Sequence, residues 1–275
     1  MRLPIHQVDA FCAPEGPGLF TGNPAAVVPL DDWLPDATLL AIAAENNLAE
    51  TAFLRGAGAA RELRWFTPAV EVALCGHATL AAGHVVLAET GAAEVRFTTR
   101  KAGVLTVRRE GERLALRLPR LDPAPVDPPE GLAAALGAAP TEVLRAHYAP
   151  DEWDEVAVFA SEAEVAALSP DFAALTRVGG GAGRSRGVIC TAPASGGGDF
   201  VSRYFAPAAG IDEDPFTGSA HGVLVPFWAG RLGRDRLSAR QISARGGWAE
   251  CALAEDAVTL VGRAVTYLVG EIWVG

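Results

Sequence analysis

Two short stretches of this 275-residue sequence carry residue types that acid–base chemistry uses, one in each half of the chain. The first, residues 75–79, reads CGHAT and offers a thiol and an imidazole. The second, residues 212–221, reads DEDPFTGSAH and offers carboxylates, hydroxyls and an imidazole. A phenylalanine, one further residue and a proline precede each stretch, as FTP at 66–68 and FAP at 205–207. This internal echo predicts two pseudo-equivalent lobes that face one another across a cleft.

An apolar run rich in small residues follows each stretch, and it predicts one helix over 76–89 and another over 219–230. The N-terminus of a helix presents unpaired N–H groups and a partial positive charge, so it favours an anion. If both helices begin at one cleft, the N–H groups near Gly76, Gly218 and Ser219 would hold the carboxylate of a small substrate.

Glu50 is the candidate for proton transfer. It falls where a polar turn at 46–49 meets an apolar strand. A carboxylate at such a junction is partly desolvated, which raises its pKa and lets it exchange protons near neutral pH. Most lone glutamates are solvated surface residues, however, and the sequence by itself leaves that alternative open.

Two glycine-containing segments are expected to be loops. Residues 22–24 read GNP, which favours a turn around Asn23 that either is only a tight turn or faces the substrate. Residues 179–183 read GGGAG and lack the Gly-Lys-Ser/Thr ending of a phosphate-binding loop. We therefore expect a mobile loop there.

Charge and composition narrow the classes of partner. A formal net charge of −10 without a lysine and arginine cluster argues against nucleic acid. The apolar runs end well short of the about 18 residues that a membrane-spanning helix needs, and the start of the sequence lacks a signal peptide's apolar core. We expect a cytoplasmic location. The four cysteines are scattered, with no CxxC pair and no histidine at metal-ligand spacing, so we expect free thiols and no metal.

Short strands account for much of the remaining sequence. Three of them predict an antiparallel meander over 93–118. Prolines gather at 119–129, and this segment is the predicted linker between an N-terminal lobe, 1–121, and a C-terminal lobe, 129–275, with the C-terminal strand free to cross over. Each lobe then has several strands and one prominent apolar helix, which predicts an α+β fold.

Five blocks of the sequence together resemble the phenazine-biosynthesis PhzF-like isomerase family. They are FTGNPAAV at 20–27, NLAET at 47–51, FTP at 66–68, CGHATL at 75–80 and DPFTGSA at 214–220. The blocks occur in the family's order and span most of the chain. The resemblance implies the diaminopimelate epimerase-like fold, in which two pseudo-symmetric lobes, each a curved antiparallel sheet around a central helix, enclose the site. It also implies a homodimer that uses no metal and no organic cofactor.

The resemblance further implies roles for single residues. Glu50 corresponds to the family's acid/base, His77 to its site histidine, and Asp214 and Ser219 to its site aspartate and serine. The implied reaction moves a proton between two carbons of a small carboxylated metabolite, and a single desolvated carboxyl can take up and return that proton on one face. His77 and Asp214 would orient the substrate or tune the carboxyl.

Two other functions stay open. Cys75 precedes Gly-His, where related epimerases carry a reactive thiol, so a racemase or epimerase would pair Cys75 with a second acid/base. The matching position in the second stretch is Thr217, which disfavours a two-thiol racemase, and a buried inert thiol is the alternative for Cys75. The third candidate is a catalytically silent binding protein on the same fold.

Overall fold

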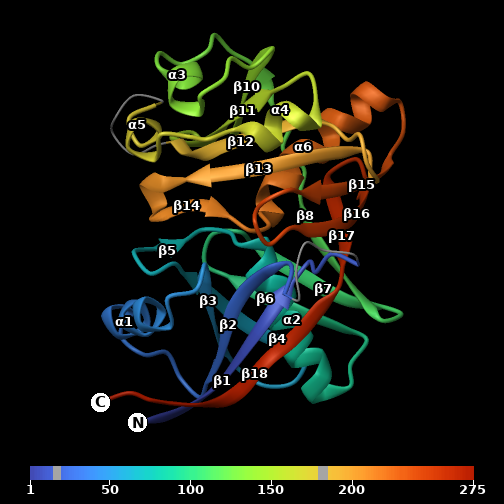
Figure 1. The fold of residues 1–275 in the computed structure, drawn as a ribbon. Helices are drawn as coiled ribbons and strands as arrows, with labels where there is room; N and C mark the ends of the chain where they lie inside the picture. Colours follow the sequence, from blue (N-terminus) through green and yellow to red (C-terminus); the bar gives the residue numbers. More distant parts are fainter. Residues whose placement is uncertain (15–19, 179–184) are drawn as a thin grey trace.

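The computed structural model describes residues 1–14, 20–178 and 185–275, which form an α+β protein of two stacked lobes (Figure 1). The glycine-rich run at 179–183, expected to be a loop, lies outside the described residues. The N-terminal lobe contains β1 (Arg2–Ala10), β2 (Asn23–Leu30), α1 (Asp36–Asn46), β3 (Glu50–Arg55), β4 (Ala60–Phe66), β5 (Glu71–Val72), α2 (Gly76–Thr90), β6 (Glu94–Thr99), β7 (Val104–Glu110), β8 (Arg113–Pro119) and β18 (Ala264–Trp273).

The C-terminal lobe follows the same plan around its own long helix. It contains β9 (Ala124–Pro125), α3 (Leu132–Leu136), β10 (Glu142–Ala149), β11 (Glu152–Val158), α4 (Glu162–Ala167), α5 (Phe172–Leu175), β12 (Ser185–Pro193), β13 (Phe200–Ala206), the 3-10 turn η1 (Pro207–Ala209), β14 (Ile211–Asp214), α6 (Gly218–Leu232), β15 (Arg236–Gln241), β16 (Gly247–Leu253) and β17 (Ala257–Gly262).

The two lobes repeat one pattern of strand pairing. In the N-terminal lobe β2 runs parallel to β3, β4 pairs antiparallel with β3 and β5 and parallel with β6, and β7 and β8 complete an antiparallel meander. In the C-terminal lobe β11, β12, β13, β14, β15, β16 and β17 repeat these pairings in the same order. The predicted internal echo is therefore a repeat of the whole strand order.

The lobes also exchange strands. After β17 the chain crosses over, and β18 pairs antiparallel with β1; after β8 it crosses the other way, and β9 pairs with β10. The two sheets join where β8 pairs antiparallel with β17. The proline-rich segment that contains β9 lies along the C-terminal lobe, while the lobe boundaries at 121 and 129 stay a prediction.

The predicted helices over 76–89 and 219–230 are confirmed as α2 and α6, which have 15 residues each. Each is buried on nearly all sides because its lobe's sheet curves around it, which suits a helix that is apolar all round. Small residues permit the close packing: a Cβ on Gly83 of α2 would lie 2.5 Å from Cγ1 of Val107 on β7. The two helices begin where the lobes meet.

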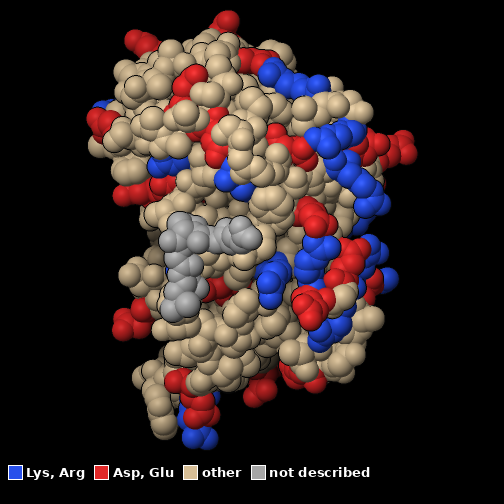
Figure 2. Space-filling model, turned by 45° about the vertical axis from the view of Figure 1, so that its right-hand side comes forward, with Lys and Arg blue, Asp and Glu red and all other residues tan. Residues whose placement is uncertain are grey.

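The surface fits the sequence's acidic composition. On the face drawn in Figure 2, lysine and arginine side chains lie among aspartate and glutamate side chains and do not merge into one basic patch outside the grey atoms. Among the helices of the described part of the chain, none is long and apolar enough to cross a membrane. Binding to nucleic acid stays disfavoured, as the net charge predicts.

Candidate active site

The first turns of α2 and α6 touch through two glycines. A Cβ on Gly76 would lie 2.8 Å from Cα of Gly218, and a Cβ on Gly218 would lie 2.8 Å from Cα of Gly76. Side chains essentially never approach backbone so closely, so glycine is required at both positions. The two helix N-termini therefore converge on one place, as the sequence predicts, with the free N–H groups of both first turns close together.

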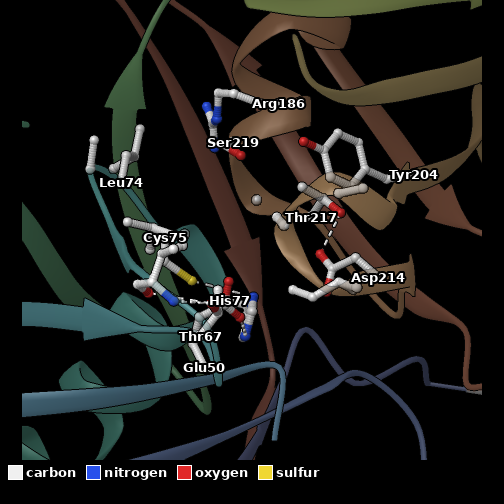
Figure 3. Close-up of a pocket in the computed structure, with 18 of the residues that line it drawn as sticks. Glu50, Thr67, Leu74, Cys75, His77, Arg186, Tyr204, Asp214, Thr217 and Ser219 are labelled. Atoms are coloured by element: carbon white, nitrogen blue, oxygen red, sulfur yellow. Dashed lines mark hydrogen bonds and ion pairs between the residues drawn. The ribbon is translucent and has the colours of Figure 1, made fainter. Parts of the chain in front are cut away.

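A cavity of about 210 Å³ opens between the lobes at this contact. Its walls carry most of the predicted site residues, which Figure 3 shows converging on it from both lobes. The N-terminal lobe contributes Glu50, Cys75, Gly76 and His77, and the C-terminal lobe contributes Asp214, Gly218 and Ser219. Asn23, also predicted, lies behind this wall and is fully buried.

Glu50 is a buried residue at the start of β3, so it is not the solvated glutamate that the sequence left open. Its Oε2 lies 3.0 Å from Nε2 of His77 on α2. The two groups are at ion-pair distance, although their alignment falls short of a hydrogen bond and both atoms are otherwise unpartnered in the described part of the chain. A proton acceptor with unused capacity therefore faces the cavity.

The charges around His77 favour its protonated form. Burial disfavours a charged imidazole, but the negative charges that Cys75 and Glu50 can carry outweigh burial, so the pKa of His77 lies well above its usual value. Burial raises the pKa of the Cys75 thiol to about 11, and Glu50 adds to this effect. Because the thiol is then neutral at pH 7, Glu50 supplies the charge that favours the imidazolium. A neutral buried thiol is a poor base.

Asn23 connects the two lobes behind the cavity. Its Nδ2 donates to Oδ1 of Asp214 at 2.7 Å and to the carbonyl of Phe216 at 2.9 Å, and it lies 3.0 Å from Nδ1 of His77. Asn23 is therefore more than a tight turn, because its amide joins the N-terminal lobe to the loop that carries Asp214, beside the ring of His77. Burial raises the pKa of Asp214 and Glu50 adds to the effect, while His77, Thr217 and Asn23 oppose it.

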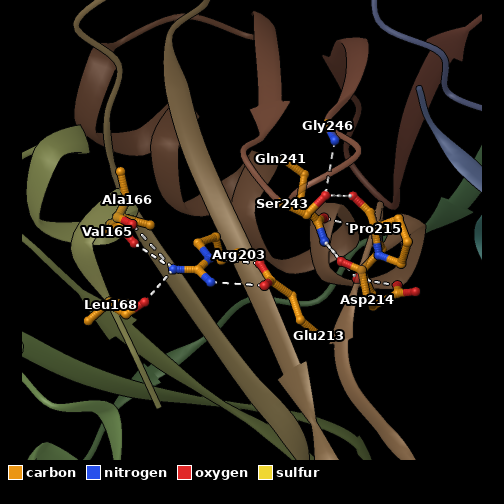
Figure 4. Close-up of polar contacts among 11 residues, drawn as sticks. Val165, Ala166, Leu168, Arg203, Glu213, Asp214, Pro215, Gln241, Ser243 and Gly246 are labelled. Atoms are coloured by element: carbon orange, nitrogen blue, oxygen red, sulfur yellow. Dashed lines mark hydrogen bonds and ion pairs between the residues drawn. The ribbon is translucent and has the colours of Figure 1, made fainter. Parts of the chain in front are cut away.

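The loop that carries Asp214 is held from both sides (Figure 4). On one side, Gln241 donates to the carbonyl of Asp214 at 2.7 Å and accepts from the N–H of Thr217 at 2.8 Å. Ser243 donates to the carbonyl of Pro215 at 2.8 Å. On the other side, Arg203 makes a two-point ion pair with Glu213, with distances of 2.7 and 2.9 Å. These hydrogen bonds and this ion pair fix the loop that leads into α6.

Sequence reasoning missed a second group of polar residues in the C-terminal lobe, the Asp154 cluster, which consists of Tyr148, Asp154, Arg186 and Tyr204. The hydroxyls of Tyr148 and Tyr204 donate to the two oxygens of fully buried Asp154, at 2.7 and 3.0 Å. Arg186 and Tyr204 line the cavity. The four residues come from four separate strands, so no local sequence motif predicts the cluster.

Glu50, Cys75 and His77 also offer ligand atoms within 4.8 Å of one another, a donor set that zinc accepts. The thiol approaches Nδ1 of the imidazole, at 3.6 Å, and the carboxylate approaches Nε2, at 3.0 Å. Because the two partners face different ring nitrogens, the arrangement suits a proton-transfer pair more directly than a shared ion. The expectation of no metal stays a prediction.

Comparisons with known proteins agree with this fold. The family model described as phenazine biosynthesis-like protein matches residues 8–270. An uncharacterized isomerase of Pseudomonas aeruginosa is 49% identical over 274 residues, which cover 99% of each chain. An uncharacterized isomerase of Halalkalibacterium halodurans is 39% identical, again over 99% of each chain. Because the family model and these isomerase relatives match nearly the whole chain, the chain belongs to the phenazine biosynthesis-like protein family and is an isomerase.

Solved structures show the same architecture. A PhzF-family protein of Enterococcus faecalis is 40% identical, with a TM-score of 0.84 over 100% of both chains. A hydroxyproline epimerase of Agrobacterium vitis is 12% identical, with a TM-score of 0.60 over 98% of this chain and 92% of the other. The second likeness shows that the two-lobed, epimerase-like fold persists at low sequence identity.

Proposed function

We propose that the protein is a cofactor-independent isomerase that moves a proton between two carbons of a small carboxylated metabolite, with Glu50 as the acid/base. The observation that carries this proposal is the buried pair of Glu50 and His77, 3.0 Å apart, beside two helix N-termini that meet in one cavity. The pair can exchange a proton, and the helix termini can hold the substrate's carboxylate.

The reaction divides naturally between these parts. The N–H groups at Gly76, Gly218 and Ser219 bind the carboxylate and stabilise the negative charge that develops when an adjacent C–H bond breaks. Glu50 takes the proton, and the electron pair of the broken bond spreads into the conjugated acid. Glu50 then returns the proton to another carbon, whose new C–H bond uses the displaced electron pair. Atoms and charge balance without a further reactant.

His77 and Asp214 would keep Glu50 ready for this cycle. The imidazolium of His77 would balance the charge of the Glu50 carboxylate, 3.0 Å away, and Asn23 holds Asp214 beside the ring.

Glu50→Gln tests the assignment. In D₂O, the wild type should exchange deuterium into members of a panel of small unsaturated and α-substituted carboxylic acids, observed by NMR. The variant should fold, and its rate of deuterium exchange should fall by a factor of about 10²–10⁴, because a positioned acid/base accelerates a reaction by that factor. Lys101→Met is the control, because Lys101 also lines the cavity but is exposed. Full activity in Glu50→Gln would refute the assignment.

The racemase alternative makes a different prediction. Deuterium would enter the α position of an amino acid, and the rate would depend on Cys75. We expect Cys75→Ala to retain activity within about threefold, because a thiol whose pKa is about 11 contributes little base at pH 7. If the protein is instead a catalytically silent binding protein, the wild type should exchange no deuterium. Neither substitution would then change the exchange rate.

We also propose a homodimer that forms through β18. This strand pairs with β1 on one side, and along it Tyr267, Val269 and Trp273 are 56%, 66% and 78% exposed. An exposed apolar edge strand favours pairing with a second copy. Sedimentation of the wild type should give a dimer, and Val269→Arg should shift it toward a monomer. The cytoplasmic location stays a prediction.

A further inference from the structure

The guanidinium of Arg186 faces the cavity with unused hydrogen-bond donors. Its side chain is 19% exposed, and it is ion-paired through Nε with Glu152 at 3.5 Å. Within the described part of the chain it donates no hydrogen bond to a carbonyl or hydroxyl. A guanidinium has five N–H donors, and the partly exposed donors of Arg186 can bind an acceptor in the cavity that they line. Figure 3 shows Arg186 pointing into the same space as Ser219.

The Asp154 cluster fixes this side chain without using its donors. Cζ of Arg186 lies 3.9 Å from the centre of the Tyr148 ring, so the planar group is held against an aromatic face. Asp154 supplies compensating negative charge, but its two oxygens already accept from Tyr148 and Tyr204. If charge balance were the only role of Arg186, a direct hydrogen bond to Asp154 would be the stronger arrangement.

The internal symmetry shows where this arginine lies relative to Glu50. Thr51 pairs with Phe66 of the first Phe-x-Pro segment, and Val188 pairs with Phe205 of the second. The position equivalent to Glu50 in the C-terminal lobe is therefore Gly187, which directly follows Arg186. Arg186 is thus one position before the equivalent of Glu50, at a register shift between β11 and β12, and it lines the cavity from the opposite lobe.

We propose that Arg186 is the binding site for a second carboxylate, so that the substrate is a small dicarboxylic acid. This inference rests on the proposed function, in which the helix termini hold the first carboxylate near Glu50. A guanidinium edge matches a carboxylate with two parallel hydrogen bonds. A singly charged group fits better than a phosphate, because Asp154 and Glu152 already place negative charge beside Arg186.

Binding of succinate and butyrate tests this site, because the two acids have the same carbon number and differ by one carboxylate. Titration calorimetry or ligand-observed NMR should show that the wild type binds succinate at least about tenfold more tightly. Arg186→Gln should reduce this preference to near one and leave butyrate binding unchanged. Arg186→Lys keeps the charge beside Asp154 but loses the planar fork, and its preference should fall at least threefold.

Lys101→Met is the matched control, because Lys101 also lines the cavity but is exposed. It should keep the succinate preference within twofold. Equal binding of the two acids by the wild type, or an undiminished preference in both Arg186 variants, overturns the proposal. Glu50→Gln separates the two proposals, because it should bind succinate like the wild type. If this variant keeps full turnover, the proposed function fails. The ratio of succinate to butyrate affinity still decides the role of Arg186 in that case.

Discussion

The two lobes share a strand order but differ in the chemistry that they present, and β3 and β12 show the difference most directly. In the N-terminal lobe, the position at the start of β3 carries Glu50. In the C-terminal lobe the equivalent position carries Gly187, where a Cβ would lie 2.7 Å from the hydroxyl of Tyr204. Glycine leaves room for the tyrosine that holds Asp154. The same strand position thus carries a carboxylate in one lobe, and in the other it makes room for the polar cluster around Asp154.

The helix starts continue this contrast. Gly76 and Gly218 are equivalent and identical, because each must admit the backbone of the other helix. The next positions are His77 and Ser219, and the preceding ones are Cys75 and Thr217. The helix starts with their free N–H groups are therefore kept in both lobes, whereas the imidazole beside Glu50 occurs in one. Under the proposed function, the symmetric parts of the fold would bind the substrate and the asymmetric parts would act on it.

His77→Ser breaks the asymmetry most strongly, because it copies the C-terminal residue into the N-terminal lobe. We expect deuterium exchange to slow by about 10²–10⁴, since Glu50 loses the charge that supports proton transfer. Steady-state kinetics with the most active acid of the panel measures this loss. As a control, the affinity of this variant for succinate should stay within twofold of the wild-type affinity. An exchange rate within threefold of the wild-type rate would show that His77 does not support proton transfer by Glu50.

Gly218→Ala breaks the shared element. The added methyl meets backbone atoms of Gly76 at 2.8 Å, so the two helix termini must separate. Misplacement by about 1 Å costs on the order of a hundredfold in rate, and we expect a lower melting temperature as well. Gly230→Ala in the same helix is the control, because its Cβ would meet nothing within 4 Å. Equal behaviour of the two variants would show that the close contact is dispensable.

His221→Thr sharpens the comparison through stability. Nδ1 of His221 lies 2.8 Å from the carbonyl of Thr217, and the hydroxyl of the equivalent Thr79 bonds the carbonyl of Cys75. Burial lowers the pKa of His221 from 6.5 to about 4. Between these values the unfolded chain binds more protons, so stability is lost as the pH falls, by roughly 3 kcal/mol over the window.

Urea unfolding at pH 7 and pH 4.5 measures this effect. The wild type should lose more stability than His221→Thr between the two conditions, because threonine has no proton to take up. Carboxylates that titrate in the same range contribute equally to both proteins and cancel in the comparison. If both proteins lose the same amount, His221 is not responsible for the acid sensitivity of the C-terminal lobe.

The local parts of the site follow from the sequence. The starts of α2 and α6 were predictable, since each combines a loop, a glycine and an apolar run within about ten residues. Glu50 was predictable as a candidate through its place at a polar–apolar junction and through the family's block order. Its burial and its 3.0 Å approach to His77 depend on how β3 packs against α2, which periodicity does not encode.

The distant parts of the site do not follow from the sequence. Asp154, Arg186 and Tyr204 lie on three strands, and which side of a strand faces the cavity depends on sheet register. Asn23 illustrates the same limit, because Gly-Asn-Pro specifies a turn but not the approach of its amide to His77 or its hydrogen bonds to Asp214 and Phe216 in the other lobe. Side chains that join separate elements are visible only once those elements are assembled.

The crossing of β18 onto β1 ties the order of synthesis to the assembly of the site. The N-terminal lobe contains Glu50 and His77, yet one of its strands is made of residues 264–273. As the chain leaves the ribosome, the N-terminal lobe keeps an open sheet edge until residues 264–273 have been made. The lobe that contains Glu50 and His77 is therefore completed by a segment more than 180 residues further along the chain, so a fragment of residues 1–121 would lack one of that lobe's strands.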